Sequence, residues 1–210
     1  MGEDDYDLFM PEDHMDKLYS SGNSIIRNFH HNRLNFIVKK LPKIQGLKIL
    51  DAGCGEGHLS EKLVNSNRGY KVYGTDLYPL ALEKAKKRCP KAKFLKQNLN
   101  KIEFDDNYFD IVICSGVIEH IRGYKESIKE MKRVTKNNGL LIISIPNEPL
   151  WTFTRFILGR KPAKIPDHIN TFTPKKLKKE VKLKVIKNIY LPLNVCFATC
   201  LESILFFRKL

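Results

Sequence analysis

The stretch ILDAGCGEGHLS places an acidic residue, Asp51, at the end of an apolar run and then three glycines at alternate positions, Gly53, Gly55 and Gly57. Glycine loses more conformational freedom on ordering than any other residue, so this spacing indicates a backbone that turns sharply beside a ligand. The dinucleotide-binding pattern G-x-G-x-x-G would need its third glycine where His58 stands. Because Asp51 would also repel a pyrophosphate, the stretch favours a ligand with a cationic group.

A second acidic residue, Asp76, ends the next apolar run, VYGTDL. A carboxylate at the end of the second strand of an α/β unit is placed to accept hydrogen bonds from both hydroxyls of a ribose. Asp51 and Asp76 together therefore predict a ligand that joins a cationic group to a nucleoside.

Apolar runs alternate along the chain with segments whose apolar residues recur every three to four positions. We expect strands at 47–53, 71–77, 93–95, 140–146 and 183–191, another strand beginning at 109, and helices at 24–41, 58–66, 79–90, 124–136 and 173–182. The strand segments are apolar along their whole length, which is typical of a parallel sheet covered on both faces. In such a sheet the ligand binds beyond the carboxyl ends of the strands, where the glycines and both acids lie.

The composition is that of a globular protein, with 210 residues of which 42% are apolar and 29% charged. The first sixteen residues are acidic rather than a basic and apolar leader, and the five cysteines form no C-x-x-C pair. We therefore expect a cytoplasmic protein without a zinc site. The formal net charge of +14 comes from 28 Lys and only 9 Arg. Because arginine is the main reader of base edges, general lysine usage explains this charge better than a nucleic-acid surface does.

Four motifs in order resemble the class I S-adenosylmethionine-dependent methyltransferases, in particular the type 11 branch that includes the ubiquinone-biosynthesis O-methyltransferases. They are ILDAGCGEG, VYGTDL, LKQNLNKIEFDDNYFDIVICSGVIEHI and MKRVTKNNGLLIISIPN, within residues 46–147. The resemblance implies an α/β fold with a Rossmann-like, doubly wound, mostly parallel seven-stranded sheet and helices on both faces. It divides a single domain, 1–210, into an N-terminal arm and helix (1–45), a cofactor-binding core (46–147) and an acceptor-side insertion with the C-terminal part (148–210).

The resemblance also implies that the cofactor is S-adenosyl-L-methionine. Gly53, Gly55 and Gly57 would surround its methionine part, Asp51 would face that part through the loop or its amino group, and Asp76 would bind the ribose hydroxyls. The other implied cofactor-binding positions are Leu77 against the adenine, Asn98 and Leu99 beside its amino group, Ser115 near the sulfonium, and Arg33 on the methionine carboxylate.

For two of these positions the sequence leaves another role or residue type open. The family more often has Asp where Asn98 stands, although the Asn side-chain oxygen can still accept a hydrogen bond. For Arg33 the alternative is a solvated arginine on a helix surface.

Methyl transfer displaces a methyl group from a sulfonium, so the protein mainly aligns the acceptor and excludes water. A hydroxyl acceptor benefits from a base, and the resemblance puts His168 and His120 in that role, with Glu119 beside His120. A structural hydrogen bond is the alternative for His120. No N-P-P-Y-type tetrapeptide follows the fourth strand, which disfavours methylation of a base nitrogen. No Asp/Glu/His trio resembles the divalent metal site of catechol-type enzymes, although ligands scattered along the sequence could still meet in space.

The preferred hypothesis is O-methylation of a small molecule or a lipid. The alternatives are an RNA methyltransferase that uses the basic C-terminal third, and a non-catalytic regulatory protein that binds S-adenosylmethionine. Residues 192–210 form either a final strand or an amphipathic helix, and such a helix beside KKLKKEVKLKVIK would rest on an anionic membrane surface. We favour packing of this tail in the core. For the aromatic residues Trp151, Phe153 and Phe156 we favour ordinary packing under a loop over an apolar acceptor pocket or lid.

Overall fold

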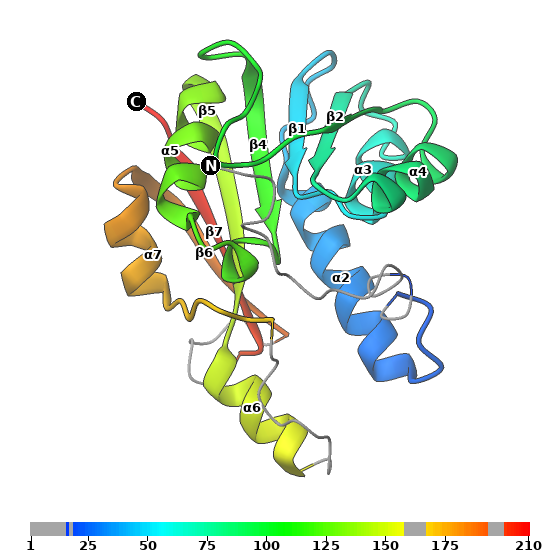
Figure 1. The fold of residues 1–210 in the computed structure, drawn as a ribbon, viewed down its shortest axis with the longest axis vertical. Coiled ribbons are helices and arrows are strands. Elements are labelled where there is room, and N and C mark those ends of the chain that lie inside the picture. The colour runs from blue at the N-terminus through cyan, green and yellow to red at the C-terminus, as the bar shows by residue number, and fades with distance from the viewer. Residues whose placement is uncertain (1–15, 17–18, 158–166, 193–199) are drawn as a thin grey trace.

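The computed structural model describes residues 16, 19–157, 167–192 and 200–210 of the chain (Figure 1). The arm expected over residues 1–20 lies outside the described residues except for Asp16, Tyr19 and Ser20. The structure therefore tests the expected elements from residue 24 onward, apart from 158–166 and 193–199.

Seven strands of the described chain form one sheet in the order β3-β2-β1-β4-β5-β7-β6. They are β1 (Lys48–Ala52), β2 (Lys71–Asp76), β3 (Lys93–Lys96), β4 (Phe109–Ser115), β5 (Thr135–Pro146), β6 (Lys184–Leu191) and β7 (Glu202–Arg208). The first five run parallel, whereas β7 pairs antiparallel with both β5 and β6. The expected mostly parallel, doubly wound sheet is confirmed. Its strand order reverses between β1 and β4, the position where open sheets bind ligands.

Helices cover both faces of the sheet (Figure 1). They are α2 (Ser24–Lys40), α3 (His58–Val64), α4 (Pro79–Arg88), α5 (Tyr124–Val134), α6 (Glu148–Ile157) and α7 (Pro174–Val181), with a short 3₁₀ turn, η2 (Ile118–His120). Successive strand residues point to opposite faces. Leu50 accordingly packs in the apolar cluster that includes α5 and α7, and Ile49 packs in the cluster that includes α2 and α3.

Residues 137–139, which lie between the expected helix 124–136 and the expected strand 140–146, belong to β5 and form an irregular part of it. The register of β4 against β5 jumps from the pair Phe109 and Thr135 to the pair Ile111 and Leu140. Asn138 has a positive φ of 60° within this irregularity. The strand therefore begins earlier than its apolar run suggests.

The C-terminal segment 202–208 is a buried strand, so the amphipathic-helix alternative is wrong for these residues. Ile204 and Phe206 pack in one apolar cluster, and Leu205 and Phe207 pack in the other. Contact with a membrane through this part of the tail is thereby overturned, because its apolar side chains already lie in the core. Within the described part of the chain, no helix has the length and hydropathy needed to cross a bilayer.

Residues 148–157 form α6, a helix that the sequence pattern did not predict. It extends away from the sheet at the bottom of Figure 1. Phe153 is 58% exposed and Phe156 is 72% exposed, so the expected packing of these two aromatic side chains is wrong. Trp151 does pack, with its ring 5.7 Å from that of Phe29 in α2.

Candidate functional site

The glycine-rich turn joins the end of β1 to the start of α3. Gly53, Gly55 and Gly57 have positive φ values of 76°, 50° and 82°, a region that residues with a Cβ rarely adopt. Gly53 donates its N–H to the carbonyl of Thr75 at 2.8 Å, which ties the turn to β2. A Cβ at Gly53 would lie 2.5 Å from Val117 Cγ1, so this turn closely approaches the loop that follows β4.

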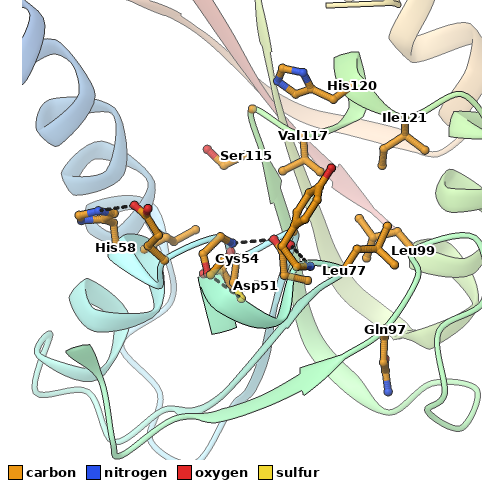
Figure 2. A pocket seen from close by; sticks show the side chains of 18 of the residues that line it. Asp51, Cys54, His58, Leu77, Gln97, Leu99, Ser115, Val117, His120 and Ile121 are labelled. Carbon is orange, nitrogen blue, oxygen red and sulfur yellow. Dashed lines mark hydrogen bonds and ion pairs between the residues drawn. The ribbon is translucent and has the colours of Figure 1, made fainter. Parts of the chain in front are cut away.

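A cavity of about 250 Å³ opens beyond the carboxyl ends of β1, β2 and β4 (Figure 2). Figure 2 shows Leu99, Val117 and Ile121 on one side of this space and Asp51 and His58 on the other. Nine of the ten residues that we expected to bind the cofactor line it: Arg33, Asp51, Gly53, Gly55, Asp76, Leu77, Asn98, Leu99 and Ser115. An apolar wall with a few polar groups suits a nucleoside.

Gly57 is the exception among the ten, because it does not line this cavity. A Cβ at Gly57 would lie 3.0 Å from both Cα and Cβ of Ala85 in α4. In place of the expected position around the methionine part, the structure gives Gly57 a packing role that lets α3 begin close to α4.

Two carboxylates face the cavity, that of Asp51, which is buried, and that of Asp76, which is partly buried. Asp76 Oδ2 accepts the N–H of Gly55 at 2.8 Å and Oδ1 accepts the N–H of Tyr78 at 3.1 Å, while burial raises the pKa of this carboxyl. Asp51 is 3% exposed and accepts a hydrogen bond from Ser60 Oγ at 2.7 Å. Burial, together with the negative charge of Asp76, raises the pKa of Asp51 to about 7. A cationic group beside these two acids would favour their charged forms.

Arg33 is buried, so the alternative of a solvated helix arginine is wrong. Its Nη1 donates to Glu202 Oε1 at 3.1 Å and to Oε2 at 3.2 Å, and its Nη2 donates to the Tyr19 hydroxyl at 3.1 Å. Within the described residues, the buried Nε of Arg33 has no hydrogen-bond partner. Strand β7 thus contributes to the site through Glu202, a residue that the sequence pattern did not single out.

His58, at the start of α3, lines the cavity and contacts residues from before α2. Its ring stacks on Tyr19 with the ring centres 4.1 Å apart, and both residues line the cavity. Its Nε2 lies 2.9 Å from Asp16 Oδ1, and burial lowers the pKa of His58 to about 4. Arg88 Nη2 donates to the same Asp16 carboxylate at 2.5 Å. These contacts bring Asp16 and Tyr19, from before the first described helix, to the edge of the cavity.

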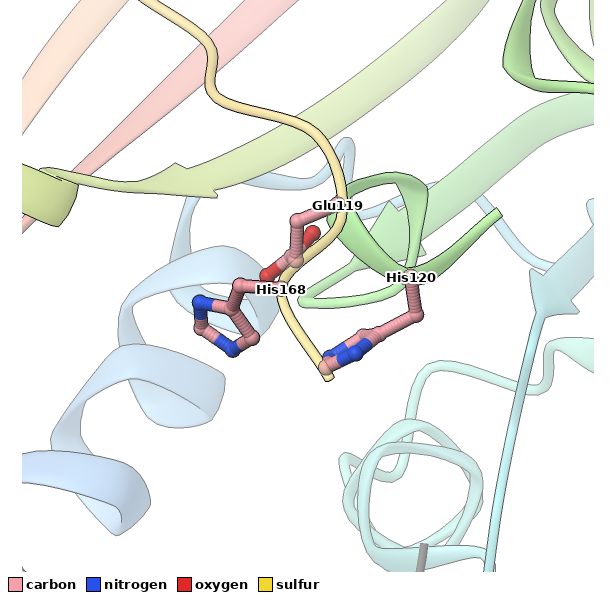
Figure 3. A group of neighbouring side chains, drawn as sticks. All are labelled: Glu119, His120 and His168. Carbon is pink, nitrogen blue, oxygen red and sulfur yellow. The ribbon is translucent and has the colours of Figure 1, made fainter. Parts of the chain in front are cut away.

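A cluster of polar side chains lies beside the cavity (Figure 3). Glu119 and His120 come from η2, and His168 comes from the segment before α7. One ligand atom of each lies within 4.8 Å of the others, and the rings of the two histidines lie 4.7 Å apart. Donor groups at this spacing could hold a metal ion, which agrees with the alternative that ligands scattered along the sequence meet in space.

Glu119 is the most buried member of this cluster. It is 3% exposed, and burial raises its pKa to about 7. Its Oε2 has no hydrogen-bond partner among the described residues. A buried carboxylate oxygen without a hydrogen-bond partner can accept a hydrogen bond from a donor group of a ligand.

Hydrogen bonds join the two segments that carry the cluster. Asn170 donates its N–H to the carbonyl of Glu119 at 2.9 Å and its Nδ2–H to the carbonyl of Ile121 at 2.6 Å. His120 Nδ1 lies 2.9 Å from the carbonyl of Asp167, and His168 Nδ1 pairs with Glu148 Oε1. The sequence singled out His120 and His168. It missed Asn170 and Glu148. The only signals for them were that Asn170 lies close to His168 and that Glu148 follows the end of a strand.

Part of the chain is similar to known methyltransferases. Residues 50–143 match a family model described as a methyltransferase domain. The ubiquinone biosynthesis O-methyltransferase of Rickettsia typhi is 28% identical over 167 residues, which are 73% of this chain and 67% of that protein. A probable S-adenosylmethionine-dependent methyltransferase of Mycobacterium tuberculosis is 29% identical over 123 residues, 58% of this chain and 44% of that protein.

A solved structure of magnesium protoporphyrin IX methyltransferase from Synechocystis, with bound S-adenosylhomocysteine, has a similar fold. The TM-score is 0.73 at 20% identity, and the match covers 94% of each chain. The seven-stranded sheet has the Rossmann-like fold of S-adenosylmethionine-dependent methyltransferases. Residues 50–143 resemble a methyltransferase domain, and the named relatives support an enzyme whose cofactor is S-adenosylmethionine.

Proposed function

We propose that the cavity binds the methionine part of S-adenosylmethionine against Gly53 and Gly55. The cationic amino group of the cofactor would lie near Asp51, a carboxylate buried beside a second acid. Its carboxylate would pair with Arg33, whose buried Nε has no partner within the described chain. Ser115 would lie near the sulfonium, because it ends β4 at the cavity wall.

The nucleoside part is assigned to the other half of the cavity. Asp76 would accept hydrogen bonds from the ribose hydroxyls, as the carboxylate at the end of β2. The adenine would lie against Leu77 and Leu99, with Asn98 beside its amino group. The support for this assignment is that all four residues line the cavity.

Asp76→Ala is expected to weaken the binding of S-adenosylhomocysteine at least tenfold. The change removes two charge-assisted hydrogen bonds of roughly 1.5–3 kcal/mol each. Calorimetry measures the affinity, and thermal unfolding checks the fold, since Asp76 also accepts hydrogen bonds from Gly55 and Tyr78. Asp105→Ala is the control, because Asp105 is exposed and does not line the cavity. Equal affinities of the two variants would remove Asp76 from the cofactor site.

We propose that the enzyme methylates an oxygen atom of a small molecule or a lipid. The observation that carries this proposal is the largely buried cluster of Glu119, His120 and His168 beside the cavity, whose wall includes His120. The cofactor supplies an electrophilic methyl group, and a hydroxyl acceptor must lose a proton as it attacks. An imidazole of the cluster would accept that proton. The names of the Rickettsia relatives, which are O-methyltransferases, agree with this assignment.

The test is incubation of the purified protein with methyl-labelled cofactor and separated cell fractions of lipids, small molecules and RNA. Each incubation is run with and without added divalent cations, because the cluster has donor groups that could hold one. We expect the label in a lipid or small-molecule product, with the methyl group on oxygen in its NMR spectrum. Label confined to RNA, falling steeply with salt, would instead support an RNA acceptor for the basic C-terminal third.

A further inference from the structure

The two histidines of the cluster have different partners on Nδ1. His168 Nδ1 pairs with the carboxylate of Glu148 through Oε1. His120 Nδ1 lies 2.9 Å from the main-chain carbonyl of Asp167, and the carboxylate of Asp167 is more distant, at 3.4 Å. A main-chain carbonyl is neutral, so it holds a ring in place but stabilises positive charge on it less than a hydrogen-bonded carboxylate does.

Glu148 is held in a fixed position. It is 5% exposed and lies in the first turn of α6, where a negative charge is favourable. The preceding residue, Asn147, donates its N–H to the carbonyl of Leu201 at 2.9 Å and its Nδ2–H to the carbonyl of Cys200 at 2.9 Å. Helix α6 therefore begins on a backbone that is bonded to the segment leading into β7.

A carboxylate on Nδ1 has three effects on an imidazole. It keeps the proton of a neutral ring on Nδ1, so that Nε2 carries the lone pair; it fixes the ring plane; and it stabilises the imidazolium that forms when Nε2 takes a proton. Burial disfavours charge on His168, but the carboxylates of Glu148 and Glu119 outweigh burial and raise its pKa. His168 is accordingly the histidine of the cluster whose Nδ1 is paired with a buried carboxylate.

We propose that Glu148 is a positioning residue that fixes the tautomer and orientation of His168, and so prepares His168 as a proton acceptor. This inference rests on the proposed O-methylation. As the acceptor oxygen forms its bond to the methyl carbon, the bond from that carbon to sulfur breaks, and the hydroxyl proton passes to Nε2 of His168. The products are the methyl ether, S-adenosylhomocysteine and an imidazolium that returns its proton to solvent.

The kinetic test compares Glu148→Ala and Glu148→Gln with Glu126→Ala, using catechol as the hydroxyl probe. Glu126 is a matched control, because it is an exposed glutamate in the first turn of α5. Glu148→Ala is expected to lower kcat roughly ten- to a hundredfold with little change in KM. Glu148→Gln should recover part of the rate, because its amide oxygen still accepts the Nδ1–H. Binding of S-adenosylhomocysteine should be unchanged in all three variants.

A second readout does not depend on methyl transfer. Long-range proton–nitrogen correlation spectra report the tautomer of each imidazole, and Glu148→Ala is expected to move the ring resonances of His168 while those of His31 stay in place. Unchanged His168 resonances would overturn the positioning role, and so would an unchanged kcat. If no hydroxyl compound accepts the methyl group, the proposed function fails, and the His168 resonances alone then decide whether Glu148 orients the ring.

Discussion

A chain that ends after Leu191 is expected not to fold. Strand β7 lies between β5 and β6, and its residues 204–207 are buried in both apolar clusters. Burial of one large apolar side chain contributes roughly 1.5–3 kcal/mol, so these four contribute about 6–12 kcal/mol. That range is comparable to the whole unfolding free energy of a typical domain, about 5–15 kcal/mol. Circular dichroism and thermal unfolding measure the outcome.

The control for this truncation is removal of Leu210 alone. Leu210 is 79% exposed and lies after β7, so its loss should leave the unfolding midpoint nearly unchanged. A cooperatively folded chain ending after Leu191 that still binds S-adenosylhomocysteine would contradict the expectation. It would mean that β5 can serve as a stable sheet edge without its antiparallel neighbour.

Gly55→Val is expected to abolish binding of S-adenosylhomocysteine. Gly55 lines the cavity at a positive φ of 50° and donates its N–H to Asp76 Oδ2. A branched side chain would occupy space in the cavity, and it would also strain this backbone conformation. The strain can move the N–H away from Asp76, which adds to the loss. Calorimetry with S-adenosylhomocysteine is the measurement.

Gly46→Val separates the effect of backbone strain from the effect of a side chain that occupies the cavity. Gly46 has a similar positive φ of 77°, no atom lies within 4 Å of an added Cβ there, and it does not line the cavity. This variant should show a comparable loss of thermal stability with cofactor affinity retained. Binding lost in both variants would point to general destabilisation, and binding retained in Gly55→Val would remove this loop from the cofactor site.

The cofactor half of the fold could be predicted from the sequence because its signals are local. The parallel strands appear as apolar runs, and Asp51, Gly53 and Asp76 stand next to the strand ends that position them. Gly57 shows the limit of this reasoning. Gly57 is required because a Cβ there would collide with Ala85, a residue of a different helix. The spacing of glycines in the sequence does not distinguish such a packing contact from contact with a ligand.

The acceptor side could be predicted only in part, because it depends on contacts between distant segments. His120 and His168 come together through bonds that Asp167 and Asn170 make to the turn after β4. Helix α6 leaves the aromatic side chains of Phe153 and Phe156 exposed, which the apolar composition of this segment does not predict. The place of 202–208 in the middle of the antiparallel part of the sheet follows from pairing with β5 and β6, which an apolar run by itself does not specify.

The thiol of Cys54 lies where an alkylating cofactor could methylate it. Cys54 lines the cofactor cavity, donates to the carbonyl of Gly55 at 3.7 Å, and burial raises its pKa well above that of a free thiol. Only a thiolate attacks an alkyl sulfonium readily, and at neutral pH almost none forms in these surroundings. The raised pKa therefore disfavours the thiolate of Cys54, which is the form that could take a methyl group from an alkylating cofactor.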